Sequence, residues 1–328
     1  MLNVICVAIL TATTAILVQM SIWAWRARIA ALKWAGISIG VVLAAAFAAS
    51  TSVMMVGLYR LNARSAPVPG LKIAGTHEQI QRGQAIADGF CASCHSKTGT
   101  LTGGSDIGKE FPVPIGSFVS SNLTPAGPLK WWSDGEIFRA IRNGVDANGR
   151  WLIVMSLTNA GNLSDDDIQA LIAYIRSTPA AGAQTPDPPD EVSPLGVAML
   201  GAGLLPGDKP VFTRAIKAPA KEPTEQYGEY IVSYQDCRLC HGDNLAGGKG
   251  GLAPLGPDLN LVKKWKREEF ISTMRTGTDP NGHEIDGNQM PWQEIGKMDD
   301  VELGALHEYL VHLPGGQAPV ANRANVTR

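Results

Sequence analysis

Two short stretches decide how this sequence is interpreted: CASCH at residues 91–95 and CRLCH at residues 237–241. Both have the pattern C-x-x-C-H, which is typical of covalent haem attachment. Two thiols three residues apart can each form a thioether with one vinyl group of the same porphyrin, and the next residue can then place its imidazole on the iron. The sequence therefore predicts two covalently attached haem c groups. The expected attachment cysteines and iron-binding histidines are Cys91, Cys94, His95, Cys237, Cys240 and His241.

Two other chemistries use closely spaced cysteines, and both fit this sequence less well. Zinc ligation would need further Cys or His at matching spacing. A thiol redox pair needs no His and favours a βαβ context. Nothing in the sequence supports either alternative. The fifth cysteine, Cys6, lies in an apolar stretch and is given no role.

The two motifs lie in two copies of one repeated pattern. EIFRAIRNGVDANGR at 136–150 aligns with EFISTMRTGTDPNGH at 269–283. This regularity indicates two similar domains, which we expect at 75–180 and 222–313. The other expected parts are a membrane anchor at 1–59, a linker at 60–74, an interdomain linker at 181–221 and a C-terminal tail at 314–328.

Each repeat is predicted to contain three helices joined by long Gly- and Pro-rich loops. Ser133 and Glu136 form a capping-box pattern that opens a helix, and Gly144 is expected to end it. A unit of about 100 residues with such loops builds little core of its own, so a large apolar filler such as haem is expected. Besides the helix that opens at Ser133, the predicted helices are 78–90, one that Ser164 opens and that carries Ile175, and 225–235, 267–275 and 299–310.

Methionines between the second and third helices are the candidates for the sixth iron ligand. In the first repeat, Met155 is the only Met after His95, and no further His follows in that repeat. In the second repeat, Met290 occupies the corresponding stretch between the second and third helices. His283 is the alternative, although its alignment with Arg150 predicts that it is not a ligand. Two other methionines, Met274 in the second helix and Met298 at the start of the third, are interpreted as core or helix residues.

Ligation by His and Met indicates electron transfer. A soft thioether favours Fe(II) and raises the reduction potential. With both axial positions filled, no position remains for peroxide, oxygen or substrate. A diheme enzyme of the peroxidase or thiosulfate dehydrogenase type would need a displaceable or absent distal ligand, so it is the less favoured alternative.

Several residues are candidates for supporting the haem. The axial imidazole usually donates its second N–H to a carbonyl, and Pro257 and Pro114 are the expected acceptors. Further candidates, for bonds to the haem propionates, are Trp132, Trp265, Arg142 and Arg275.

The first 59 residues predict membrane attachment. Residues 2–25 and 34–59 carry no charge, and each is long enough to cross a bilayer as a helix. Three basic residues lie between them, which predicts a cytoplasmic turn and places the later residues outside. We therefore expect a multi-pass protein of the bacterial inner membrane with periplasmic haem domains. A cleaved signal peptide followed by one span is the alternative. A third apolar run, at 196–205, is too short to span and is expected to pack between or beneath the repeats.

Composition limits the remaining function classes. The chain has 328 residues with a net charge of −2, and the positive residues near the N-terminus leave an acidic excess on the remainder. This argues against nucleic-acid binding, which needs a clustered basic surface. The expected partners are membrane lipid and redox proteins, because an acidic surface attracts a basic partner.

Both repeats resemble class I cytochrome c domains. Gly83 and Gly228 precede the haem motifs, and Tyr174 and Tyr309 lie in the last helices, which cross the first helices closely in that family. The resemblance implies two tandem class I cytochrome c domains. Together with the two uncharged N-terminal stretches, it leads us to expect a mainly α fold with two N-terminal transmembrane helices.

The run SNLTPAGPLKWWSDGEIFRAIRNGVDANGRWLIVMSL at 121–157 is similar to the cytochrome c subunits of membrane-bound alcohol and gluconate dehydrogenases. Val154 replaces that family's Ala, no Pro follows Met155, and those subunits usually carry three haems without twin N-terminal spans. The resemblance implies electron transfer from a dehydrogenase or quinol-oxidising complex to a terminal oxidase or soluble carrier.

A second resemblance, ranked lower, is to the diheme subunit of cbb-type oxidases. That subunit also combines N-terminal spans with two cytochrome c domains. Its acidic and paired-Trp motif is not found beside the spans here, and the Trp pair at 131–132 lies within the first repeat instead.

Overall fold

The computed structural model describes residues 1–205, 210–248 and 254–314. Most of the predicted C-terminal tail, residues 315–328, therefore lies outside the described residues. The chain divides into two compact units, one of Met1–Ser65, Asp106–Phe118 and Asp190–Lys209, the other of Ala66–Ser105, Val119–Pro189 and Pro210–Arg328. Residues 106–118 and 190–205 thus pack with the N-terminal helices, and the domain boundaries given above remain a prediction.

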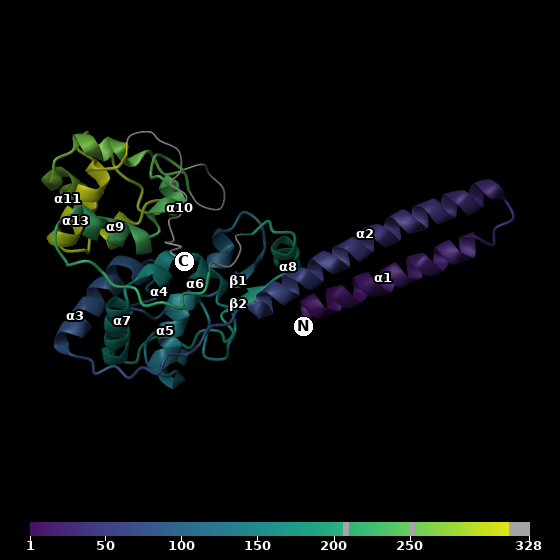
Figure 1. The fold of residues 1–328 in the computed structure, drawn as a ribbon, viewed down its shortest axis with the longest axis horizontal. Coiled ribbons are helices and arrows are strands. Elements are labelled where there is room, and N and C mark those ends of the chain that lie inside the picture. The colour runs from purple at the N-terminus through teal and green to yellow at the C-terminus, as the bar shows by residue number, and fades with distance from the viewer. Residues whose placement is uncertain (206–209, 249–253, 315–328) are drawn as a thin grey trace. The chain divides into compact units, whose positions relative to one another are not determined.

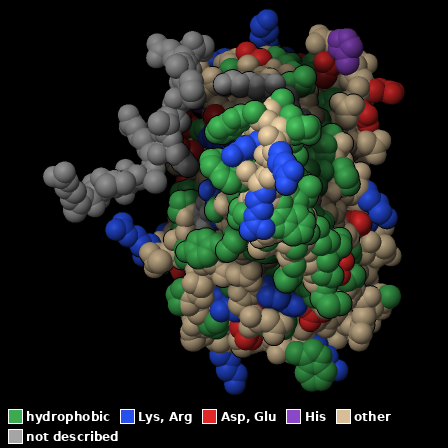
Figure 2. Space-filling view, turned by 90° about the vertical axis from the view of Figure 1, so that its right-hand side faces the viewer, with side chains coloured by type: hydrophobic (Ala, Val, Ile, Leu, Met, Phe, Trp, Pro, Cys, Tyr) green, Lys and Arg blue, Asp and Glu red, His purple; other side chains and the backbone are tan. Residues whose placement is uncertain are grey.

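The first unit is built on two long apolar helices, α1 (Leu2–Ala24) and α2 (Ala30–Ala63), which lie side by side (Figure 1). Both are long and apolar enough to cross a membrane. Figure 2 shows hydrophobic side chains along this pair and basic side chains gathered at its turn. At the turn, the Lys33 ammonium lies 4.1 Å from the Trp25 ring centroid.

A small element packs on α2 within the same unit. The short run expected to pack between or beneath the repeats, at 196–205, forms most of α8 (Pro194–Gly201), which packs on α2. The backbones of α2 and α8 approach so closely at Gly57 that a Cβ added there would lie 2.1 Å from the Val197 carbonyl oxygen. Arg60 also donates to the Leu200 carbonyl at 2.6 Å. Two short strands complete the unit, β1 (Gly116–Phe118) antiparallel to β2 (Asp190–Val192), together with η2 (Ile107–Glu110).

The second unit contains both haem motifs. We call residues 66–105 with 119–189 the first repeat segment, and residues 210–314 the second repeat segment. The first repeat segment contains α3 (His77–Ile86), η1 (Ala87–Cys91), α4 (Ala92–His95), η3 (Pro128–Trp131), α5 (Asp134–Asn143), α6 (Ile153–Leu157), η4 (Asn159–Asn162) and α7 (Asp165–Ser177). The second contains α9 (Glu225–Tyr234), α10 (Cys237–His241), η5 (Leu259–Lys264), α11 (Arg267–Thr276), α12 (Trp292–Ile295) and α13 (Asp300–Val311).

The helices begin and end where the local chemistry predicts. Ser133 and Glu136 form the expected capping box of α5, and Gly144 ends that helix in the left-handed conformation. One difference lies before Cys91. The predicted continuous helix widens there into the π-helical turn η1, a feature often found at functional sites.

Each repeat segment is organised by one close helix crossing. A Cβ added to Gly83 in α3 would lie 1.9 Å from the Ala170 carbonyl oxygen of α7. A Cβ added to Gly228 in α9 would lie 2.0 Å from the Ala305 carbonyl oxygen of α13. Glycine at both positions therefore allows the two backbones to touch, as the cytochrome c resemblance implies. One hydrophobic core extends through both segments.

Candidate haem-attachment sites

The four motif cysteines lie at matching places in the two repeat segments. Cys91 ends η1, Cys94 lies in α4, and Cys237 and Cys240 lie in α10. All four are half-buried, and Cys91 and Cys237 pack against the common core. Burial raises the pKa of both of these thiols to about 12. Reactive thiol pairs have lowered pKa values instead, so this environment does not suit a thiol redox pair.

The two histidines are oriented in the same way. His95 Nδ1 donates to the Ser121 carbonyl oxygen at 2.8 Å, and His241 Nδ1 donates to the Pro257 carbonyl oxygen at 2.8 Å. Each bond leaves Nε2 as the ring nitrogen that could bind iron. Burial lowers the pKa of both imidazoles, although the carbonyl acceptors partly oppose this, so the neutral, metal-binding form is favoured.

The acceptor predicted for the second motif is confirmed, but the one predicted for the first is wrong. The Pro114 carbonyl accepts from the Ser193 hydroxyl at 2.7 Å. Residues around Pro114 are held by pairing between β1 and β2, so a carbonyl seven residues further along takes the role.

A loop after each histidine completes its environment, and sequence reasoning missed it. Gly103 N–H donates to the His95 carbonyl at 2.7 Å, and Gly247 N–H donates to the His241 carbonyl at 3.0 Å. Two residues before each glycine stands a buried leucine in the left-handed region, at φ 54° and φ 59°. These leucines are Leu101 and Leu245. Such strain at equivalent places indicates that the loop shape serves the site.

The candidate distal residue of the first segment, Met155, lies half-buried in α6. Its neighbour Ser156 packs on the left-handed end of α5, since a Cβ added to Gly144 would lie 2.4 Å from Ser156 Cβ. The Trp151 indole also donates to the Ser156 hydroxyl at 2.6 Å. The short helix that carries Met155 is therefore held against the middle helix.

In the second segment, Met290 and His283 occupy different environments. Met290 is half-buried against the core, and nearby Trp292 packs on Gly277, which ends α11 as Gly144 ends α5. The His283 side chain is 79% exposed, and its Nδ1 lies 3.2 Å from Asp279 Oδ2 in the same turn. The other two methionines are buried in the core: Met274 and Met298.

The candidate propionate ligands have protein partners in this structure. Arg142 Nη1 donates to the Gly161 carbonyl at 2.6 Å, and its Nη2 lies 2.6 Å from Asp165 Oδ1. Arg275 is placed in the same way, with Asp300 Oδ1 at 3.1 Å. Both arginines therefore tie the middle helix to the start of the third. Trp132 and Trp265 pack against the core.

The donor set fits a covalently attached haem c. Each motif presents two thiols at a helix and a neutral imidazole with one nitrogen already oriented. Within the residues that the structure describes, no group of three or more Cys, His, Asp or Glu is placed to hold a metal ion.

Paired C-x-x-C-H motifs, closely crossing helices and oriented histidines define a c-type cytochrome. The chain belongs to the family described as "Cytochrome C oxidase, cbb3-type, subunit III", which matches residues 78–175 and 223–310. Membership implies covalently bound haem c.

Several curated proteins are similar to this chain. A nicotinate dehydrogenase subunit of Pseudomonas putida is 29% identical over 309 residues, covering 86% of this chain and 25% of that protein. The cytochrome c subunit of the quinone-dependent alcohol dehydrogenase of Gluconacetobacter polyoxogenes is 26% identical, covering 72% and 56%. The gluconate 2-dehydrogenase cytochrome c subunit of Pantoea cypripedii is 30% identical over 172 residues, covering 49% and 37%. The chain thus spans about half or less of these relatives' lengths.

Proposed function

We propose that this chain is a membrane-anchored diheme c-type cytochrome that carries electrons between a dehydrogenase or quinol-oxidising complex and a terminal oxidase or soluble carrier. The observation that carries the proposal is the repeated geometry around His95 and His241. Each imidazole donates to a backbone carbonyl at 2.8 Å beside two half-buried cysteines. Two equivalent sites in one compact unit support two haems in one electron path.

The proposed attachment residues are Cys91 with Cys94 and Cys237 with Cys240, and the proposed iron ligands are His95, Met155, His241 and Met290. Haem c with His and Met ligands supplies a one-electron couple of raised potential. The burial of Met290 and the exposure of His283 support the methionine as the distal ligand. The protein's own contribution is to hold the imidazoles neutral and oriented and to keep water from the core.

The partner proposal rests on the relatives. The relatives from Gluconacetobacter polyoxogenes and Pantoea cypripedii are named as cytochrome c subunits of an alcohol and a gluconate dehydrogenase, which supports a dehydrogenase as the electron donor. The family description names a cbb3-type oxidase subunit, which makes attachment to an oxidase the second candidate.

Location at the bacterial inner membrane is part of the proposal. The two apolar helices α1 and α2 support insertion into lipid. Arg26, Arg28 and Lys33 in and beside their turn support a cytoplasmic turn and haem domains on the periplasmic side.

Haem stoichiometry in detergent-purified full-length protein tests the proposal. We expect two haem equivalents per chain by the pyridine haemochrome assay. The double variants Cys91→Ser/Cys94→Ser and Cys237→Ser/Cys240→Ser should each retain one. Cys6→Ser is the matched control and should retain two. Fewer than two equivalents in the unaltered protein, or colour extracted by acidified acetone, would contradict covalent diheme attachment.

Substitution at the distal positions tests the ligand assignment. Met155→Ala and Met290→Ala should each convert one ferric haem from low spin to a form that binds cyanide readily, whereas His283→Ala should leave both haems low spin. A five-coordinate haem in the unaltered protein would instead favour a diheme enzyme.

A further inference from the structure

The two haem motifs meet at their equivalent ends. Gln235 lies two residues before Cys237, and Gly89 lies two residues before Cys91. The Gln235 side-chain amide donates to the Gly89 carbonyl at 3.2 Å, and both groups are buried. The first cysteine of each motif is therefore two residues from a direct contact between the segments.

Aromatic packing strengthens this meeting point. Phe90, which directly precedes Cys91, lies edge-on to Tyr234, with 6.1 Å between ring centroids. On the other side, a Cβ added to Gly89 would lie 3.5 Å from Met298 Cγ. Side chains of the second repeat segment thus contact the residues that lead into the first haem motif.

A second polar contact joins the distal side of the first site to the second motif. Asp236, which directly precedes Cys237, accepts hydrogen bonds from the backbone N–H and the side-chain amide of Asn159, both at 2.9 Å. Asn159 follows Met155 by four residues. Nearby, Asn162 Nδ2 donates to the Ser233 carbonyl at 2.6 Å.

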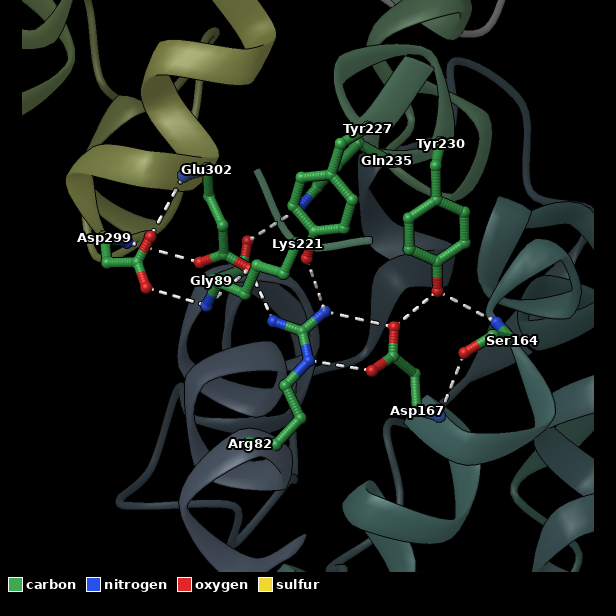
Figure 3. A network of polar contacts seen from close by, with 10 residues as sticks. All are labelled: Arg82, Gly89, Ser164, Asp167, Lys221, Tyr227, Tyr230, Gln235, Asp299 and Glu302. Carbon is green, nitrogen blue, oxygen red and sulfur yellow. Dashed lines mark hydrogen bonds and ion pairs between the residues drawn. The ribbon is translucent and has the colours of Figure 1, made fainter. Parts of the chain in front are cut away.

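A buried charge network holds the two segments together beside these contacts (Figure 3). Arg82 of α3 pairs with Asp167 of α7 at 2.7 Å and with Glu302 of α13 at 2.5 Å. Tyr230 of α9 donates to Asp167, and Tyr227 accepts from Arg82 at 3.2 Å. Asp167 and Glu302 are buried and Arg82 is half-buried, so the network links the two segments away from bulk water.

We propose that the docked segments place the two haems for direct electron exchange, and that Gln235 and Asp236 are positioning residues that set the geometry of this exchange. The inference rests on the proposed function, because it requires a haem at each motif. One electron leaves one haem and reduces the other, with no bond made or broken and no further reactant. We call the residues that form this contact the haem junction: Gly89, Phe90, Asn159, Tyr234, Gln235 and Asp236.

Circular dichroism of the haem absorption band tests this in the full-length protein. Two porphyrins held close in a fixed orientation give a two-signed couplet that neither gives alone. We expect the unaltered protein to show this couplet. Its amplitude should exceed that of the summed spectra of the two single-haem variants, Cys91→Ser/Cys94→Ser and Cys237→Ser/Cys240→Ser. A two-haem protein whose spectrum equals that sum would overturn the inference. Fewer than two haem equivalents would instead overturn the proposed function.

Variants at the junction test the positioning role. The double variant Gln235→Ala/Asp236→Ala should lose the couplet while keeping two haems and its helix content. Asp236→Asn should retain it, because the new side chain keeps an oxygen that can accept from Asn159. The control Arg267→Ala removes an ion pair to Glu308 outside the junction and should change nothing. An unchanged couplet in the double variant would show that these two residues do not position the haems. Should that variant lose haem or fold poorly, the comparison in the unaltered protein still decides whether the haems are coupled.

Discussion

Arg82 and Glu302 form an ion pair with 2.5 Å between Nη1 and Oε1, although 220 positions separate them in the sequence. The same guanidinium binds Asp167, so one cation serves a carboxylate from each repeat segment. Burial alone would lower the pKa of Arg82, but the paired carboxylates raise it above its usual value. The relative placement of the two haem motifs therefore depends on this contact.

Removing that cation should destabilise the protein strongly. In Arg82→Met, Asp167 and Glu302 stay buried and lose their main partner, which costs about 3–5 kcal/mol. Chemical denaturation followed by tryptophan fluorescence measures the loss. The control Arg267→Met breaks a more exposed pair with Glu308 and should cost about 1 kcal/mol or less. Equal losses in the two variants would contradict the role given to Arg82.

The two equivalent arginines of the repeats should differ in importance. Arg142 is buried and binds two carbonyls and Asp165, whereas Arg275 is partly exposed and pairs with an exposed Asp300. Arg142→Ala should cost about 2–4 kcal/mol. Arg275→Ala should cost about 1 kcal/mol. Thermal unfolding in detergent compares the two, and a larger loss for Arg275→Ala would contradict the burial argument.

A single methyl group should disturb the second haem site, if a haem is bound there as proposed. A Cβ added to Gly256 would lie 2.6 Å from His241 Nδ1, so Gly256→Ala should displace either the imidazole or the loop that carries Pro257. We expect an increased high-spin fraction in one haem by electron paramagnetic resonance. Gly70→Ala is the control, because a Cβ there meets nothing within 4 Å. An unchanged spin state in Gly256→Ala would show that the loop accommodates the methyl group without displacing His241, which would contradict the prediction.

The start of α13 should become less stable in acid. Burial raises the pKa of Asp299, but Lys221 and the helix N–H groups outweigh it and hold the pKa below its usual value. Because the carboxyl of Asp299 has a lower pKa in the folded state than in the unfolded state, it stabilises the fold at pH values above its unfolded-state pKa of about 4. This stabilisation is lost as the pH falls through the pKa of the folded state. Asp299→Asn keeps a capping side chain without the charge. The unaltered protein should therefore be more stable than Asp299→Asn near neutral pH, and this difference in unfolding free energy should shrink below a pH of about 4. Denaturation at a series of pH values measures the difference. A difference that stays constant across pH would contradict this account.

Much of the fold follows from local sequence. The capping pattern at Ser133, the terminating Gly144 and the apolar runs of α1 and α2 predict helices that the structure confirms. The repeat also predicts that His283 matches Arg150, and both side chains do bond the aspartate of their own turn. These features depend on residues only a few positions apart, so the local sequence is enough to predict them.

The sequence by itself determined the chemistry of the haem motifs, because two thiols and an imidazole lie within five residues of one another whatever surrounds them. Only the tertiary structure decided which carbonyl orients His95. The Ser121 carbonyl accepts from the imidazole, whereas the Pro114 carbonyl belongs to the other unit and accepts from Ser193. The tertiary structure also decided that Gln235 meets Gly89, 146 positions away. Such contacts depend on how buried surfaces and charges of distant segments match, and no local pattern encodes that match.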